Sequence, residues 1–469
     1  MRVLLVKPRP DAVQFGLAPF FQTEPLGLEY IASALEDRGH SAVIADMRFR
    51  RGGIADLLES FGPDLVGISC LHILDASATL RLADEVKAFS KDIFVLVGGH
   101  AASAYPSALS QSLSINAMGI GEGEALVPAL CDTLEERRPL DAIPALLLRT
   151  EAGEFRRTSP EAGFLDLACV KIPDRAKVAS FQKDYCCLNY MPVWSLETTR
   201  GCPHRCKFCS VWQFYKGSCR FHSPGPVRAD FQSAGPNLFI IDDIFWAEKA
   251  QSEELAGALL GLGERKNWIL VQSRTDLVAQ SPELLETWRP LANNFDIFFG
   301  FESPIETRLT SLNKGSDVAE TVQAIKTARA LGYGVTGNFI IDPDFAEEDF
   351  ERLWRFLDEN QLHRVGFTIL TPLPGTHYFE QVKDQLSVLD WDQYDLHHLL
   401  WQPRLPVERF FELYCETWRR SVLNLGGNKR WWNWIHGISP LQIPRLARIL
   451  WRTQKLMNPK AYLDEARLP

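Results

Sequence analysis

Three cysteines in one short loop are the residues whose types and spacing most clearly indicate chemistry. Cys202, Cys206 and Cys209 follow a C-x3-C-x2-C pattern. Thiolates from one tight loop can ligate three irons of a cubane iron–sulfur cluster and leave the fourth iron open for a substrate or cofactor. A tetrahedral zinc site needs a fourth ligand, for which His204 and Cys219 are the nearest candidates. The spacing therefore predicts a metal centre, with a cluster favoured over zinc.

The same loop resembles the signature of the radical S-adenosylmethionine (radical SAM) enzymes. An aromatic residue, Phe208, precedes the last cysteine, and residues 193–196 form a predicted strand that leads into the loop. The resemblance implies that the open iron binds the amino and carboxylate groups of S-adenosylmethionine, and that one electron cleaves this cofactor to a 5′-deoxyadenosyl radical. It also implies that Phe208 lies against the adenine, with plain packing as the alternative role.

Alternating strands and helices after residue 191 are predicted to position the loop. Helical patterns, for example over residues 317–331 and 347–360, separate six short apolar runs that are typical of strands. Because this family uses a partial (β/α)6 barrel, the resemblance assigns that fold to residues 191–385. The six predicted strands cover residues 193–198, 238–241, 269–272, 295–301, 335–341 and 365–370.

Polar residues stand at or near the ends of four of these strands, where barrel enzymes carry their chemistry. By resemblance, Asp242 and Asp243 bind the ammonium group of S-adenosylmethionine, and Arg274 binds its carboxylate as a fork. Glu302 would bind the ribose hydroxyls, and Asn338 would lie beside the adenine. A helix cap or a surface ion pair is the alternative role for each side chain. No general acid or base is assigned, because a cofactor radical abstracts the hydrogen.

Residues 1–150 also alternate strands and helices, which predicts an α/β domain with a parallel sheet covered on both faces. Ligands of such sheets bind at the carboxyl ends of the strands, and glycines there allow close approach to the backbone. Together with the cysteine loop, this pattern resembles the Rossmann-like cobalamin-binding domain of the class B radical SAM enzymes. The residues assigned to cobalamin by this resemblance, with ordinary turns as the alternative, are Ser69, Leu71, Gly98, Gly99, Gly121 and Glu122.

The loop after the first strand departs from the classical cobalamin-binding pattern. Classical domains place a histidine there as the lower cobalt ligand, whereas residues 7–16 contain none. The radical SAM branch of the family commonly lacks this ligand, so the departure is compatible with cobalamin. His72 and His100 are the nearest histidines, and each is more typical of a polar packing residue than of a metal ligand. The lower ligand is therefore not assigned.

Composition indicates a cytoplasmic protein with reduced thiols. The chain has 469 residues, a formal net charge of −9 and ten cysteines, and its first residues resemble a strand rather than an export signal. It contains no run of 18 or more apolar residues, so a membrane-spanning helix is not expected. Glycines and prolines interrupt residues 151–190, which predicts a linker between the two domains.

The C-terminal region, residues 386–469, is predicted to be mainly helical, basic and rich in tryptophan. Residues 417–463 carry nine basic residues and no acidic one. A basic amphipathic helix with tryptophan can lie in a membrane interface, so peripheral contact with anionic lipid is one prediction. Packing against the barrel is the alternative, and nucleic acid is not the expected partner although the charge would permit it.

These features predict a cobalamin-dependent radical SAM C-methyltransferase that acts on an unactivated carbon. Residues 211–215 and 369–376 most resemble the hopanoid C-3 methylases. That resemblance implies a hopanoid-type polycyclic lipid substrate, methylcobalamin as methyl donor, and flavodoxin or ferredoxin as electron donor.

Three other functions share parts of this scaffold. The first is a ring cyclase of the anaerobic magnesium-protoporphyrin ester type. The second is a transfer-RNA methylthiotransferase, which normally has further cluster cysteines in its N-terminal domain, where this chain has only Cys70 and Cys131. The third is a non-enzymatic cobalamin or iron–sulfur sensor, which would not need acidic residues at several strand ends.

Overall fold

A computed structural model describes most of the chain, in two compact units. It describes residues 1–10, 21–159, 163–187, 190–363, 365–387, 390–423, 451 and 453–465. The first unit comprises most of residues 1–185 together with residues 220–233, and the second comprises residues 186–219 and the described residues from 234 onward. The tryptophan-rich run at residues 431–434 and most of the predicted amphipathic segment lie outside the described residues.

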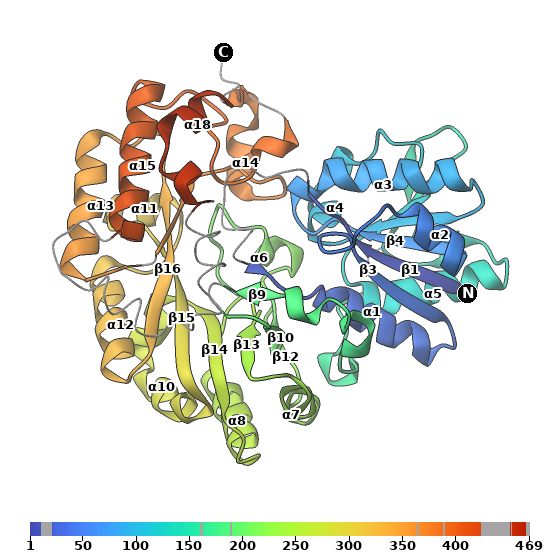
Figure 1. Ribbon diagram of the computed structural model, residues 1–469, viewed down its shortest axis with the longest axis horizontal. Coiled ribbons are helices and arrows are strands. Elements are labelled where there is room, and N and C mark those ends of the chain that lie inside the picture. The colour runs from blue at the N-terminus through green and yellow to red at the C-terminus, as the bar shows by residue number, and fades with distance from the viewer. Residues whose placement is uncertain are drawn as a thin grey trace. The chain divides into compact units, whose positions relative to one another are not determined.

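The first unit contains a seven-stranded sheet in the order β3-β1-β4-β5-β6-β7-β8 (Figure 1). The first five strands in this order are parallel, and β7 and β8 extend the sheet as an antiparallel hairpin. The strands are β1 (Arg2–Lys7), β3 (Ser41–Asp46), β4 (Leu65–Ser69), β5 (Phe94–Gly98), β6 (Ala117–Gly119), β7 (Leu146–Arg149) and β8 (Phe155–Arg157). The parallel strands confirm the predicted α/β fold.

Helices of the first unit pack in two groups against this sheet. Helix α1 (Leu26–Asp37) lies beside α5 (Gly123–Glu135), and α2 (Ala55–Phe61) lies beside α3 (Ala76–Phe89). In Figure 1, α3 is above the sheet and α1 is below it. Leu28 and Leu35 on α1 repeat at helical spacing and are buried against Val3 and Leu5 of β1. Such burial on both faces explains why the parallel strands are almost wholly apolar.

The second unit contains a six-stranded parallel sheet in the order β10-β13-β14-β15-β16-β17. Spatial order follows chain order, and among the described residues the edge strands β10 and β17 do not pair, so the sheet is an open half-barrel. The predicted partial barrel is confirmed. Its strands are β10 (Trp194–Leu196), β13 (Asn237–Ile240), β14 (Lys266–Ser273), β15 (Ala292–Glu302), β16 (Gly334–Ile341) and β17 (Gly366–Ile369).

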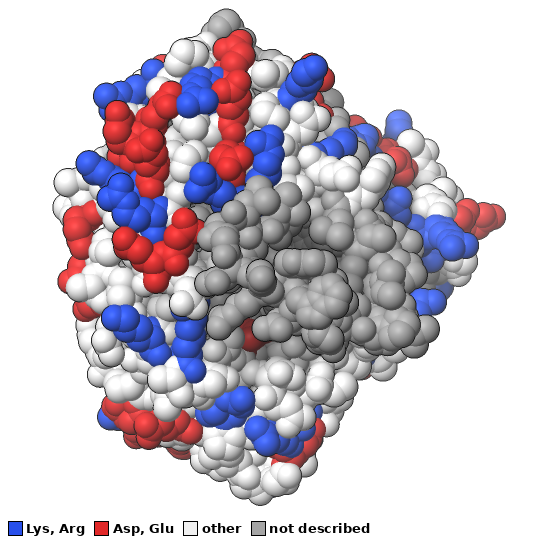
Figure 2. Space-filling model, turned by 60° about the vertical axis from the view of Figure 1, so that its left-hand side comes forward, with Lys and Arg blue, Asp and Glu red and all other residues white. Residues whose placement is uncertain are grey.

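Helices follow the strands of the half-barrel and cover its outside. They include α8 (Lys249–Leu260), α10 (Pro282–Trp288), α12 (Val318–Ala330) and α13 (Glu347–Glu359), and α15 (Val407–Leu423) packs beside α13. Figure 2 shows basic and acidic side chains interspersed over the face it displays. Between α13 and α15, for example, Arg409 pairs with Glu347 at 2.8 Å and with Glu412 at 3.1 Å.

Several aromatic side chains in the described part of the C-terminal region are buried. Trp418 on α15 lies edge-on against Phe367 of β17, with ring centroids 5.3 Å apart. Tyr462, on the short helix α18 (Pro459–Leu463), stacks on Phe411 at 4.9 Å. No helix in the part of the chain that the structure describes is both long and apolar enough to cross a membrane.

Candidate cluster and cofactor sites

Two aspartates after β13 hold the backbone that leads into the cysteine loop. The Asp242 carboxylate accepts hydrogen bonds from the backbone N–H of Thr198 at 2.6 Å and of Thr199 at 3.1 Å, and from the Thr198 hydroxyl. Asp243 accepts one from the backbone N–H of Gly201 at 2.9 Å. Burial raises the pKa of Asp242 to about 7 and that of Asp243 to about 6. Both side chains position the loop, and their contact with the ammonium of S-adenosylmethionine stays a prediction.

Backbone contacts on another side fix the same loop to the half-barrel. Lys207 donates its N–H to the carbonyl of Leu312 at 3.0 Å and accepts from the N–H of Tyr378 at 2.9 Å. The Asn313 side-chain amide donates to the carbonyl of Arg205 at 2.7 Å. The loop is therefore held by the segments that follow β13, β15 and β17, and such support on several sides suits a rigid metal site.

The three loop cysteines have the surroundings of a soft metal site. Cys206 is buried, Cys202 and Cys209 are half-buried, and the N–H of Cys209 donates to the carbonyl of Cys206 at 3.2 Å. Burial raises the pKa of all three thiols. The pKa of Cys209 rises to about 12, and the nearby Cys202 and Cys206 contribute to this rise. Thiols in such surroundings ionise when a metal supplies positive charge. The donor set fits an iron–sulfur cluster.

Phe208 lies beside the loop in a small apolar cluster. It packs against Leu312, Ile340 and Leu370. Ile340 lies near the carboxyl end of β16, and Leu370 directly follows β17. The packing role considered for this side chain is therefore present, and its predicted contact with the adenine stays a prediction.

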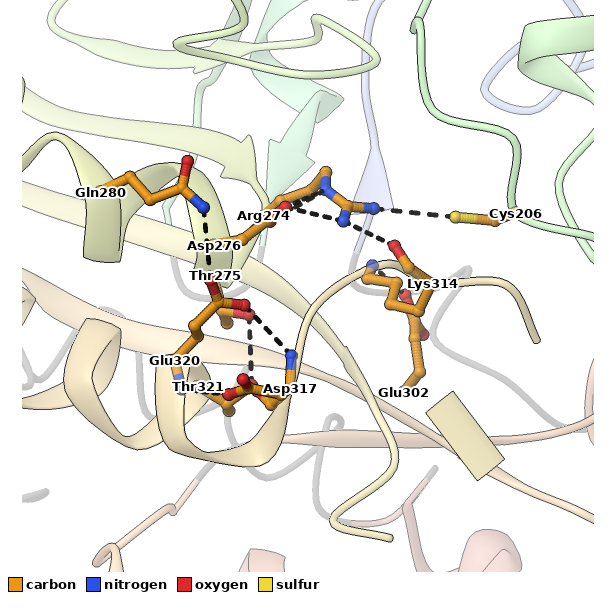
Figure 3. A network of polar contacts seen from close by, with 10 residues as sticks. All are labelled: Cys206, Arg274, Thr275, Asp276, Gln280, Glu302, Lys314, Asp317, Glu320 and Thr321. Carbon is orange, nitrogen blue, oxygen red and sulfur yellow. Dashed lines mark hydrogen bonds and ion pairs between the residues drawn. The ribbon is translucent and has the colours of Figure 1, made fainter. Parts of the chain in front are cut away.

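A buried ionic network joins the loop to the ends of β14 and β15 (Figure 3). Arg274 donates through Nε and Nη2 to the Asp276 carboxylate at 2.9 and 2.8 Å, and its Nη1 lies 3.8 Å from the Sγ of Cys206. The carbonyl of Lys314 accepts a second bond from Nη2 at 2.6 Å. The Nζ of Lys314 pairs with Glu302 at 2.6 Å. Arg274 and Lys314 are thus each paired with a carboxylate, and Arg274 reaches the predicted cluster ligand Cys206.

Two residues that were predicted to contact S-adenosylmethionine have protein partners in this network. The fork of Arg274 that was expected to meet the cofactor carboxylate faces Asp276, so its Nη1 edge is the part aimed at the cluster loop. Glu302, expected at the ribose, is buried in the left-handed conformation (φ 58°) and bonded to Lys314. Sequence reasoning missed Asp276 and Lys314. The Arg-x-Asp spacing after β14 was the available signal for the first, and no pattern marked the second.

Asn338 presents an unsatisfied acceptor in the middle of β16. Its Nδ2 donates to the Thr368 hydroxyl at 2.8 Å, while its Oδ1 is buried without a hydrogen-bond partner among the described residues. A buried acceptor of this kind needs an explanation, and the exocyclic amine of a bound adenine would supply the missing donor. At the neighbouring Gly337 a Cβ would come within 2.2 Å of the carbonyl of Phe299, so only glycine fits there. These residues fit a nucleoside cofactor.

Four of the residues predicted to contact cobalamin come together at the ends of β4 and β5. Ser69 and Gly98 pair in register, and the carbonyl of Gly98 accepts from the N–H of Cys70 at 2.7 Å. Leu71, in the loop between β4 and α3, is 59% exposed, which is unusual for a leucine beside a buried strand. Gly99 has φ 110°, and a Cβ there would lie 2.6 Å from the carbonyl of Cys70. The cradle admits a ligand close to the backbone and fits cobalamin.

The other two predicted cobalamin residues lie at the entry to α5. Gly121 has φ 95° and donates its N–H to the hydroxyl of Ser103 at 3.0 Å. The buried Glu122 carboxylate pairs with Arg220 at 2.6 and 3.1 Å and accepts from the N–H of Leu165 at 3.0 Å. Glu122 therefore has a structural role here, and its contact with cobalamin stays a prediction.

The two candidate histidines lie on the loops that carry these residues. His72 caps a short 3₁₀ turn, with its Nδ1 accepting from the N–H of Leu74 at 3.3 Å. His100 begins α4 (His100–Ala104), and burial lowers its pKa to about 4. The geometry gives His72 a local structural role.

Comparison with known families accounts for both units. The model of the B12 binding domain matches residues 17–131, and that of the radical SAM superfamily matches residues 196–357. The chain belongs to the cobalamin-dependent radical SAM enzymes. It is an enzyme of their methyltransferase family, and its cofactors are a 4Fe–4S cluster, S-adenosylmethionine and cobalamin.

Individual relatives extend this likeness over nearly the whole chain. Hopanoid C-3 methylase of Methylococcus capsulatus is 29% identical over 100% of this chain and 90% of its own length. The anaerobic magnesium-protoporphyrin IX monomethyl ester cyclase of Cereibacter sphaeroides is 25% identical over 86% and 67%. The structure of the cobalamin-dependent radical enzyme OxsB with aqua-cobalamin and S-adenosylmethionine superposes with a TM-score of 0.70 at 16% identity, over 92% of this chain and 69% of that one. The superposition confirms that a B12-binding fold is followed along the chain by a radical SAM fold.

Proposed function

We propose that this enzyme methylates an unactivated carbon of a hopanoid-type polycyclic lipid. The observation that carries the substrate class is the similarity to hopanoid C-3 methylase, which extends through the C-terminal region to the whole of this chain. Enzymes that share the cofactor-binding units would differ in the part that binds the substrate, and the C-terminal region is the candidate for that part. The small-molecule substrate and a one-electron donor, such as flavodoxin or ferredoxin, are the partners that this reaction requires.

The chain's own residues would prepare the site for this chemistry. Cys202, Cys206 and Cys209 are proposed to hold the cluster, in a loop whose entry Asp242 and Asp243 fix by hydrogen bonds. When bound, the cluster with S-adenosylmethionine supplies a carbon radical, and cobalamin supplies the methyl group.

The remaining residues of the half-barrel and the first unit would bind and orient these cofactors. Phe208 and Asn338 are proposed to hold the adenine between an apolar face and a free acceptor. Ser69, Leu71 and Gly99 are proposed to seat the nucleotide tail of cobalamin, where the backbone is open to close approach.

An anaerobic assay of the cluster- and cobalamin-loaded protein tests the proposal. Protein, S-adenosylmethionine, a strong reductant and a hopanoid extract should give a hopanoid heavier by one CH2 group, with 5′-deoxyadenosine and S-adenosylhomocysteine as co-products, by mass spectrometry. Formation of 5′-deoxyadenosine without a methylated lipid would contradict the substrate class.

A ring cyclase acting on a magnesium-protoporphyrin ester is the second candidate, since the cyclase relative covers 86% of this chain. The two reactions differ in the fate of the methyl group. S-adenosylmethionine labelled in its methyl group should label the product of a methylase and leave the product of a cyclase unlabelled.

A further inference from the structure

The guanidinium of Arg274 is buried, and its Nε and Nη2 atoms are held by hydrogen bonds to neighbouring residues. Arg274 follows the last residue of β14 and is 6% exposed. Its Nε and Nη2 edge faces Asp276, and Nη2 also bonds to the carbonyl of Lys314. These contacts fix the plane of the guanidinium and leave Nη1 pointing at the Sγ of Cys206, 3.8 Å away, as Figure 3 shows.

Among the described residues, Cys206 is the loop cysteine whose sulfur Nη1 of Arg274 contacts. Cys206 is 7% exposed, whereas Cys202 and Cys209 are half-buried. An N–H donor aimed at a ligating sulfur withdraws charge from the cluster, and this effect grows where water is excluded. The direction follows from electrostatics, since reduction adds negative charge to the cluster and a donor at the sulfur stabilises that charge.

The two nearby carboxylates limit what plain charge can do. Asp276 neutralises Arg274, and Glu302 neutralises Lys314, with closest contacts of 2.8 and 2.6 Å. Each carboxylate offsets part of its partner's charge at Cys206, and the directed N–H of Arg274 acts in addition to the charge that remains.

We propose that Arg274 is a positioning residue that raises the reduction potential of the cluster through an N–H to sulfur bond with Cys206, and that Asp276 holds it in place. The inference rests on the proposed assignment of Cys206 as a cluster ligand. It concerns the transfer of one electron from the external donor to the cluster, with no bond made or broken. The chain thereby brings the cluster within reach of a weaker electron donor.

Potentiometric titration of the cluster, followed by electron paramagnetic resonance without S-adenosylmethionine, tests this role. The double variant Arg274→Met/Asp276→Asn removes the N–H donor without leaving a buried carboxylate unpaired. We expect the ratio of reduced to oxidised cluster at a fixed potential to fall about tenfold, equivalent to about 59 mV for one electron. In Asp276→Asn alone, the amide oxygen can still accept from Arg274 and the carbonyl of Lys314 still holds Nη2, so the donor stays in place. The variant removes a negative charge, so its potential should equal or exceed that of the wild type.

Two further variants separate the directed bond from charge and from folding. Arg274→Lys keeps the charge and loses the Nη1 donor, so its potential should also fall, and this variant serves where the double variant does not fold. Lys266→Gln is the matched control, because Lys266 is a buried cation at the opposite end of β14. Eight residues of strand place it about 26 Å from Arg274, so its potential should not change.

The readouts distinguish this inference from the proposed function. A full cluster with an unchanged potential in Arg274→Lys or in the double variant would overturn the role of Arg274 and leave the ligand assignment intact. A full complement of iron in Cys206→Ala would overturn the ligand assignment itself.

Discussion

Asp242 accepts backbone hydrogen bonds from both Thr198 and Thr199, at 2.6 and 3.1 Å, across more than 40 residues of sequence. The end of β13 thus fixes the chain just where β10 turns into the cysteine loop. A buried carboxylate with several donors is costly to remove, because the donors remain buried without a partner.

Replacing Asp242 with alanine should therefore displace the cysteine loop. We expect a loss of about 3 kcal/mol in the free energy of unfolding, and less than half the normal iron content. Iron analysis and chemical denaturation would measure the two effects. The control is Asp64→Asn, which weakens one exposed hydrogen bond to the N–H of Arg2. Normal iron content in Asp242→Ala would show that the loop does not depend on this carboxylate.

The cysteine loop itself offers a test with an internal control. Alanine at Cys202, Cys206 or Cys209 should abolish most of the iron-dependent absorbance, since each thiolate would ligate a different iron. Cys219→Ala should keep the full absorbance, because a cluster with one open iron does not need a fourth cysteine. Zinc bound to four ligands including Cys219 would give the opposite result, with loss of metal in Cys219→Ala.

Much of this arrangement was predictable from sequence, because the elements are local patterns. The apolar runs predicted as strands correspond to β14, β15 and β16, and they alternate with amphipathic helices. The family signature places the cysteines in the loop that follows the first barrel strand. The antiparallel hairpin of β7 and β8 was not predicted, since its strands are short and partly polar at the edge of the sheet.

The partners of the site residues were less predictable than the residues themselves. Arg274 and Glu302 were recognised by their place at strand ends, yet their contacts with Asp276 and Lys314 depend on how a loop folds back. A sequence pattern gives the position of a charge, whereas the direction of a guanidinium is set by tertiary packing. This is also why the contact between Arg274 and Cys206 could not be predicted.

Gly99 provides a prediction for the cobalamin site. Its φ of 110° and the 2.6 Å approach of a Cβ to the carbonyl of Cys70 mean that Gly99→Ala must shift either the turn between β5 and α4 or the loop after β4. We expect cobalamin affinity to fall at least about tenfold, or 1.4 kcal/mol. Gly39→Ala is the matched control, because Gly39 also has a positive φ (79°) but open space around it. Equal cobalamin binding by the two variants, in equilibrium dialysis, would place the cofactor elsewhere.

A buried carboxyl in the first unit predicts a pH dependence of stability. Glu29 on α1 is fully buried, and neither oxygen has a hydrogen-bond partner among the described residues. Burial, and then the charge of Glu24, raise its pKa from 4.5 to about 9. The folded protein thus keeps a proton that the unfolded chain loses, so stability should fall between pH 4.5 and about 9, by at most about 1.4 kcal/mol per pH unit.

Glu29→Gln should flatten this dependence and stabilise the protein at pH 8. Urea denaturation of the wild type and the variant at pH 5.5, 7 and 8.5 would measure the slopes. Glu36→Gln, at an exposed position of the same helix, is the control and should leave the slope unchanged. Parallel pH profiles for the wild type and Glu29→Gln would show that the buried carboxyl does not carry the effect.

The last prediction concerns lipid contact by the C-terminal region. Trp418 and Tyr462 are buried against the half-barrel, so deleting residues 417–469 would remove core as well as charge. Substitution is the sharper test: glutamine at Lys429, Arg430, Arg445 and Arg448 removes four positive charges. If these residues meet an anionic surface, binding to phosphatidylserine vesicles should weaken by about 1 kcal/mol per charge.

A matched set of substitutions controls for net charge in this experiment. Arg51, Lys91, Arg137 and Arg138 are exposed on the first unit, and glutamine at these four positions gives the same change in net charge. Vesicle sedimentation at low and physiological salt should show strong loss only for the C-terminal set, with iron content unchanged in both. Equal binding by the two sets would mean that lipid contact, where it occurs, depends on overall charge, and that the C-terminal cations have no specific role in it.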